Sequence, residues 1–195
     1  MRLAVLALGA ILAAGLGVAT LRTHGAAAPS SSAAAIGGPF TMVDQDGHAV
    51  NQQVLAGKWS AVFFGYTNCP DTCPATLQAL NAAGARLGAS RKDFQVVFVS
   101  VDPARDTPAQ MKLYTANQGY PPGGLIGLTG TPAQVKAIAD AYRVFYAKAG
   151  GGSDYAVQHS AAVYLMDPKG GFVKPLLESL PPKELADQIA AAMHA

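Results

Sequence analysis

Residues 60–74 read Ser-Ala-Val-Phe-Phe-Gly-Tyr-Thr-Asn-Cys-Pro-Asp-Thr-Cys-Pro, an apolar run followed directly by a turn that contains both cysteines of the chain. Continuous runs rich in Val and Phe are typical of strands that are covered on both faces. In α/β proteins, chemistry is concentrated where such a strand ends and a helix begins. This stretch therefore predicts a buried strand with a functional turn at its carboxyl end.

The alternation of strand and helix continues along the chain. Apolar runs at 60–66, 94–101 and 125–128 are each followed by a helical pattern, at 74–87, 108–117 and 132–145. Thr107 and Thr131 are predicted N-caps because each precedes a proline at the first helical position. This alternation predicts an α/β sheet.

Two predicted hairpins flank these units. Their strands are 40–43 with 48–50, around Asp46-Gly47, and 161–166 with 171–175, around Asp-Pro-Lys-Gly at 167–170. Asp-Gly and similar turns favour antiparallel hairpins. A last amphipathic helix is expected over 182–193. We therefore expect a mixed sheet flanked by helices, with an N-terminal hairpin at one edge and a closing hairpin late in the chain.

The start of the chain has the character of a targeting segment. Residues 3–21 carry no charged side chain and as a helix would span about 28 Å, close to one bilayer core. We interpret 1–22 as an export signal or a retained anchor, and its length favours the anchor. Residues 23–38 are expected to be a flexible tether and 39–195 the working domain. This organisation predicts a protein of the bacterial cell envelope, anchored in the inner membrane with its domain in the periplasm, or exported if the signal is cleaved.

The composition excludes two classes of protein. Of the 195 residues, 50% are hydrophobic and 13% charged, whereas disordered chains are poor in apolar residues. Two of the 14 basic residues, Arg2 and Arg22, flank the apolar segment, so the remaining basic residues balance the 12 acidic ones. Nucleic-acid-binding proteins cluster Lys and Arg against phosphates. A globular domain that does not bind nucleic acid is expected.

The cysteine turn admits two uses. Because Pro74 lacks an N–H, we expect the helix to begin there with Cys73 as its N-cap, so that the spacing of Cys69 and Cys73 lies on a tight turn. Such a turn brings two sulfurs close enough for a disulfide or for one shared metal. A purely structural disulfide is disfavoured because its loop is tiny. Asp71 and the absence of nearby Lys or Arg in the sequence also disfavour a strongly acidic thiol and peroxide reduction.

His159 completes the candidate site. It follows a glycine-rich stretch at 149–153, which would make its approach to the cysteines adjustable. The chain also resembles the SCO/SenC family in three ordered motifs: Gly65-Tyr66-Thr67-x-Cys69-Pro70-Asp71-x-Cys73-Pro74, Ser100-Val101-Asp102-Pro103-x-Arg105-Asp106-Thr107-Pro108 and Asp154-Tyr155-x-x-x-His159-Ser160. The resemblance covers nearly the whole exported domain, from the Asp46-Gly47 turn to Asp167-Pro168-x-Gly170.

The resemblance implies a thioredoxin-like fold and delivery of copper to the binuclear copper site of cytochrome c oxidase. It implies Cys69, Cys73 and His159 as the metal ligands, and the copper-receiving oxidase subunit, or another periplasmic copper protein, as the partner. Two thiolates and one imidazole suit cuprous copper, whereas structural zinc sites almost always have four protein ligands. Gln158 stands where family members often carry an acidic residue. This departure concerns tuning of the metal or recognition of the partner beside His159, and it leaves the ligand assignment unchanged.

A second function is compatible with the same sulfurs. Cys69 and Cys73 would be the redox pair of a thiol-disulfide oxidoreductase that reduces cysteines of a copper-receiving subunit. Their three-residue spacer and His159 favour a metallochaperone over an enzyme. Among the neighbouring motifs, Asp102 with Arg105 and Asp106 is expected to form a structural ion pair, and Tyr66 and Tyr155 to shield the metal or simply pack.

Overall fold

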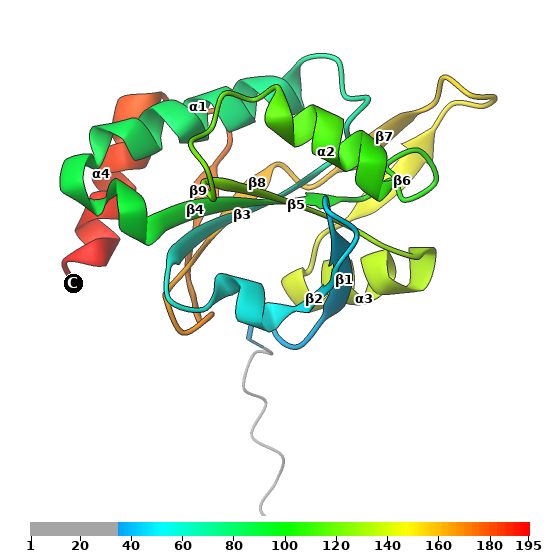
Figure 1. Cartoon of the computed structure of the whole chain (residues 1–195). Coiled ribbons are helices and arrows are strands. Elements are labelled where there is room, and N and C mark those ends of the chain that lie inside the picture. The colour runs from blue at the N-terminus through cyan, green and yellow to red at the C-terminus, as the bar shows by residue number, and fades with distance from the viewer. Residues whose placement is uncertain (1–34) are drawn as a thin grey trace, which may run out of the picture. The chain divides into compact units, whose positions relative to one another are not determined.

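The computed structural model describes residues 35–195 (Figure 1). The structure does not describe the predicted segment 1–22 or residues 23–34 of the predicted tether. The described end of that tether contacts the domain, because the Gly37 N–H donates to the Ala141 carbonyl at 2.9 Å and Ile36 packs against the core. None of the helices within 35–195 has the length and apolar character needed to cross a membrane.

A seven-stranded mixed sheet forms the centre of the domain, in the order β2-β1-β5-β4-β3-β8-β9. Its strands are β1 (Thr41–Asp44), β2 (Ala49–Asn51), β3 (Trp59–Gly65), β4 (Phe94–Ser100), β5 (Leu125–Thr129), β8 (Ala162–Met166) and β9 (Phe172–Leu177). β3 pairs with β4 and β4 with β5 in parallel, and the other pairs are antiparallel. The predicted hairpins are confirmed, and each lies at one edge of the sheet.

Helices cover both faces of this sheet. They are α1 (Thr72–Arg86), α2 (Pro108–Ala116), α3 (Pro132–Tyr142) and α4 (Pro182–Met193). In Figure 1, α1, α2 and α4 lie on one side of the sheet and α3 lies on the other. The three central strands are therefore buried from both sides, which explains their continuous apolar sequence. All seven residues of β4 are buried.

The predicted caps of two helices are confirmed. The Thr107 hydroxyl accepts from the Gln110 N–H at the start of α2. Thr131 and Gln134 form a reciprocal capping box at the start of α3. α3 ends at Tyr142, short of the predicted end at 145, because Arg143 adopts a left-handed conformation with φ 56° and ψ 38°.

The prediction for the start of α1 is wrong. The helix begins at Thr72, with Asp71 as its N-cap, so Cys73 lies in the first turn and is not the cap. The first N–H groups of a helix have no partner inside the helix, so a proline at the third helical position sacrifices no hydrogen bond. Pro74 therefore fits within the first turn. The shift directs Cys73 into the core, where its exposed fraction is 0%.

A second, two-stranded sheet was not predicted. β6 (Tyr146–Ala149) and β7 (Ala156–His159) pair with each other in an antiparallel ribbon that is separate from the main sheet. The ribbon projects beyond the end of α2 in Figure 1. Its strands are short and its turn is glycine-rich, so the sequence carries only a weak periodic signal there. The ribbon matters because its last residue is His159.

The register of the central strands sets the position of the site. Gly65 pairs with Ser100 at the carboxyl ends of β3 and β4. The cysteine turn follows β3, and the segment that contains Asp102 and Asp106 follows β4. Both segments therefore leave the sheet at the carboxyl ends of two adjacent parallel strands. This is where α/β sheets place their chemistry.

Candidate metal centre

The two cysteines lie on either side of the start of α1. Cys69 is half-buried in the turn after β3, whereas Cys73 is fully buried in the first turn of α1. The Cys73 N–H donates to the Cys69 Sγ at 3.4 Å. Asp71 makes no side-chain capping bond, so the Cys69 sulfur satisfies one of the free N–H groups at the start of the helix. Both cysteines are free thiols in this structure.

His159 reaches the sulfurs from the ribbon. Its Nε2 lies 3.8 Å from the Cys73 Sγ, and its Nδ1 lies 3.1 Å from the Ser160 carbonyl oxygen. A proton on Nδ1 that is donated to this carbonyl leaves the lone pair of Nε2 facing the sulfur. The rings of Phe63 and Tyr66 stand edge-on to the imidazole, with centroids 6.1 and 6.4 Å away. These contacts hold the imidazole against the cysteine turn.

The structure therefore brings Cys73 and His159 together but directs the Cys69 sulfur at a backbone N–H. Within residues 35–195, no three His, Cys, Asp or Glu side chains are already gathered as a complete metal-binding group. Cys69 lies on a turn and borders a cavity, so rotation of its side chain is the simplest change that would close a three-donor site. The Cys73–His159 pair is accordingly the preformed half of the candidate centre.

Burial controls the protonation of the Cys73 thiol. Removal from water raises its pKa well above the ordinary value, and the neighbouring Cys69 raises it further, against a backbone hydrogen bond that lowers it. The metal-free thiol therefore keeps its proton at neutral pH. This agrees with the expectation that the turn does not produce a strongly acidic thiol. Binding of a metal to this sulfur must displace the proton.

A cavity of about 270 Å³ opens onto the site. Its lining consists of Tyr66, Cys69, Pro70, Asp71, Thr72, Val157, His159 and Glu178. The Glu178 Oε2 is buried without a hydrogen-bond partner, and burial raises the pKa of this carboxyl while the nearby His159 lowers it. The cavity thus offers an oxygen donor beside sulfur and nitrogen. Sequence reasoning missed Glu178 because it follows β9 and belongs to none of the recognised motifs.

The two tyrosines of the motifs have different places. Tyr66 is buried, lines the cavity and contacts the His159 ring. The Tyr155 hydroxyl instead donates to the Asp102 Oδ1 at 2.6 Å. Asp102 also forms the expected ion pair, with Arg105. Tyr66 therefore belongs to the surroundings of the sulfurs, and Tyr155 belongs to a neighbouring polar network.

Close packing between β3 and α1 predicts a strong effect of Gly65→Ala. A Cβ at this position would lie 2.7 Å from the Phe98 Cε2 and 2.8 Å from the Cys73 Sγ. We expect the free energy of unfolding to fall by about 1–3 kcal/mol, as in other overpacked cores. Urea denaturation measures the change. Gly151→Ala is the control, because a Cβ there meets nothing within 4 Å. Equal stability of the two variants would contradict this packing.

The sequence matches one protein family over most of its length. The model of the SCO1/SenC family matches residues 28–194. The "Protein SCO1 homolog 1, mitochondrial" of Arabidopsis thaliana is 47% identical over 148 residues, which are 75% of this chain and 43% of that protein. The "Protein SenC" of Rhodobacter capsulatus is 41% identical over 167 residues, 85% of this chain and 74% of that protein. The chain thus spans less than half of the Arabidopsis protein.

Solved structures agree with these relatives. Arabidopsis thaliana ScoI with copper bound is 41% identical, with a TM-score of 0.77, over 82% of this chain and 99% of that chain. Bradyrhizobium japonicum ScoI with copper bound is also 41% identical, with a TM-score of 0.72, over 80% and 99% of the two chains. A structure of BsSco, described through a disulfide switch in cytochrome c oxidase assembly proteins, is 26% identical, with a TM-score of 0.65, over 82% and 94%.

Proposed function

This chain belongs to the SCO1/SenC family, and from that premise we propose that it is a copper chaperone which carries its metal on Cys69, Cys73 and His159. The observation that carries the proposal is the 3.8 Å approach of the His159 Nε2 to the Cys73 Sγ. Residues from two separate segments thereby present nitrogen and sulfur donors to the same point. The copper-bound ScoI structures of the relatives support copper as the cargo.

The donor set favours cuprous copper. Two thiolates and an imidazole are soft or intermediate donors, which suit Cu(I) better than Mg²⁺ or Ca²⁺. Three protein ligands leave the metal open to attack by the ligands of an acceptor, as release requires. The half-exposed Cys69 is the ligand through which we expect the acceptor to approach, because Cys73 is fully buried.

For the acceptor, we propose the copper-receiving subunit of cytochrome c oxidase, at its binuclear copper site. The BsSco structure is described as belonging to a family of oxidase assembly proteins, which supports this choice over another periplasmic copper protein. For the location, we propose that residues 1–22 anchor the chain in the inner membrane with the domain in the periplasm. The match to the bacterial SenC protein is consistent with this envelope setting.

A second function has its own supporting observation. Cys69, in the turn after β3, and Cys73, in the first turn of α1, are free thiols, and the Cys73 N–H contacts the Cys69 sulfur. The BsSco structure is described by a disulfide switch. As a thiol-disulfide oxidoreductase, the chain would reduce a partner disulfide to two thiols while its own pair is oxidised to a disulfide. The half-exposed Cys69 would attack and the buried Cys73 would resolve the mixed disulfide.

A genetic experiment separates these two functions. We expect deletion of the gene to lower cytochrome c oxidase activity, and added copper salt to restore it if the chain delivers copper. Rescue by a membrane-permeant dithiol, but not by copper, would instead indicate the oxidoreductase. Oxidase activity that is unchanged by the deletion would contradict both assignments of the acceptor.

The affinity for Cu(I) is expected to rise with pH. Burial raises the pKa of the Cys73 thiol, so at neutral pH the metal-free protein holds a proton that copper must displace. Each displaced proton increases the apparent affinity about tenfold per pH unit. Competition against a colorimetric Cu(I) chelator between about pH 6 and pH 8 measures this slope, after correction for protonation of the chelator. An affinity independent of pH would show that the Cys73 sulfur does not bind the metal.

A further inference from the structure

We propose that the segment 100–107, which follows β4, is a clamp that positions both halves of the metal centre: it holds the cysteine turn through Asp106 and the histidine ribbon through Asp102. Residues 100–107 are called the clamp below. The proposal deepens the proposed function, on which its copper measurements rest. It assigns positioning roles to Tyr155 and Thr67, neither of which is among the proposed ligands.

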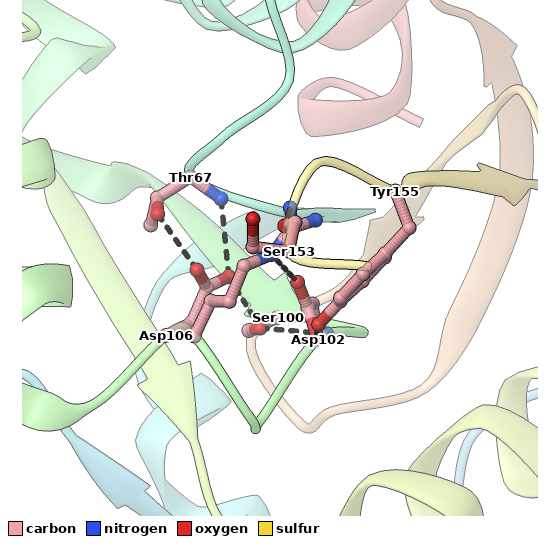
Figure 2. A network of polar contacts seen from close by, with 7 residues as sticks. Thr67, Ser100, Asp102, Asp106, Ser153 and Tyr155 are labelled. Atoms are coloured by element: carbon pink, nitrogen blue, oxygen red, sulfur yellow. Dashed lines mark hydrogen bonds and ion pairs between the residues drawn. The ribbon is translucent and has the colours of Figure 1, made fainter. Parts of the chain in front are cut away.

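The first arm of the clamp holds the cysteine turn. Asp106 is fully buried, and its carboxylate accepts the Thr67 N–H at 3.0 Å and the Thr67 hydroxyl at 2.6 Å. The Ser100 hydroxyl donates to the same carboxylate at 2.6 Å. Figure 2 shows Thr67 and Ser100 converging on Asp106. Because Thr67 lies two residues before Cys69, this carboxylate fixes the backbone from which the cysteine turn starts.

The second arm holds the ribbon. Asp102 has an exposed fraction of 1%, and its carboxylate accepts the Tyr155 hydroxyl at 2.6 Å and pairs with Arg105. The Arg105 guanidinium lies 3.7 Å from the centre of the Tyr155 ring and donates to the Ser153 carbonyl at 3.3 Å. Tyr155 directly precedes β7, the strand that ends at His159. Asp102 and Arg105 therefore bind the ribbon near its glycine-rich turn, through Tyr155 and the Ser153 carbonyl.

Ser100 joins the two arms. Its hydroxyl oxygen accepts the Asp102 N–H at 3.0 Å and donates its proton to Asp106. Figure 2 shows the two carboxylates on either side of Ser100, one toward Thr67 and the other toward Tyr155. A displacement of either arm would leave a buried carboxylate without its donors, which is costly in the protein interior. The distance between the cysteine turn and the ribbon is thereby set by one short segment.

The ribbon needs such a clamp because the main sheet does not hold it. β6 and β7 pair only with each other, and two glycines of their turn, Gly150 and Gly152, have positive φ angles. At the other end, the Ser160 N–H donates to the Phe145 carbonyl at 3.0 Å, a bond between the ribbon's own two strands, and the chain enters β8 of the main sheet at Ala162. The side-chain contacts from the clamp add the second fixed point, so that His159 lies between two attachments.

The test compares two variants with a matched control in the full-length protein. Tyr155→Phe removes the hydroxyl that binds Asp102 and keeps the ring beneath Arg105, and Thr67→Val removes the hydroxyl that binds Asp106. Ser60→Ala is the control, because Ser60 is a buried hydroxyl that bonds Gln95 near the start of β3, at the opposite end of the sheet. We expect transfer of copper to a chelator to accelerate about fivefold or more in both variants. In the control it should stay within twofold of the wild type.

A spectroscopic readout separates positioning from general stability. In the Cu(II)-loaded protein, the sulfur-to-copper absorption band and the copper hyperfine splitting should shift in Tyr155→Phe and Thr67→Val and stay unchanged in Ser60→Ala. Transfer rates and spectra that match the control would overturn the clamp. If the wild type itself binds no copper, the proposed function fails and amide hydrogen exchange of 156–159 decides alone: faster exchange in Tyr155→Phe supports the clamp, and unchanged exchange overturns it.

Discussion

Replacing Cys69 and Cys73 together by alanine is expected to abolish tight Cu(I) binding. A four-ligand zinc site gains about 10–16 kcal/mol from its metal, or about 3 kcal/mol per ligand, which corresponds to roughly 100-fold in affinity. Loss of two ligands should therefore weaken binding at least about 10⁴-fold. The loss should be larger for Cu(I), because both removed donors are thiolates. Competition against a Cu(I) chelator under anaerobic, reducing conditions measures the change.

The design of this experiment must separate ligand loss from damage to the core. Cys73 is fully buried, so its replacement leaves a small cavity, whereas Cys69 is only half-buried. The single variant Cys69→Ala loses only the bond from the Cys73 N–H, which should lower the free energy of unfolding by about 1 kcal/mol or less, and its affinity should still fall roughly 100-fold. Thr76→Ala, at another buried position of α1, controls for disturbance of the helix. Wild-type affinity in Cys69→Ala would remove this sulfur from the site.

The second large effect is expected from His159→Ala. Removal of the imidazole leaves two sulfurs, and the affinity for Cu(I) should fall roughly 100-fold. His48→Ala is the matched control, because the His48 side chain is exposed on the N-terminal hairpin and pairs with the neighbouring Asp44. The same variant separates the two proposed functions: thiol-disulfide exchange needs only the sulfurs and should persist. Copper binding that is unaffected by the substitution would exclude His159 as a ligand.

Local sequence signals were sufficient for most of the fold. The Thr-Pro pairs at Thr107 and Thr131 marked the starts of α2 and α3, because capping and the fixed φ of proline act within one turn. The two hairpins and α4 follow from turn residues and apolar periodicity in the same way. The start of α1 was misplaced because the cost of a proline was applied to a first-turn position where no hydrogen bond is lost.

The site depended on contacts between segments distant in the sequence. Neither the β6–β7 ribbon nor the burial of Cys73 has a local signature, and the approach of His159 follows from the ribbon. The sequence motifs indicated which residues belong together, but they carried no signal that the Tyr155 hydroxyl would donate to Asp102. Glu178 carries no motif, and its place in the cavity follows from the pairing of β9 with β8.

In the proposed metal centre, two sulfurs and one nitrogen of this chain bind a single cuprous ion. X-ray absorption at the copper edge, on the anaerobically reduced protein loaded with one equivalent of Cu(I), measures the ligands directly. We expect two sulfur neighbours and one nitrogen neighbour per copper, with the nitrogen lost in His159→Ala. A first shell without sulfur, or one that is identical in the wild type and in His159→Ala, would contradict it.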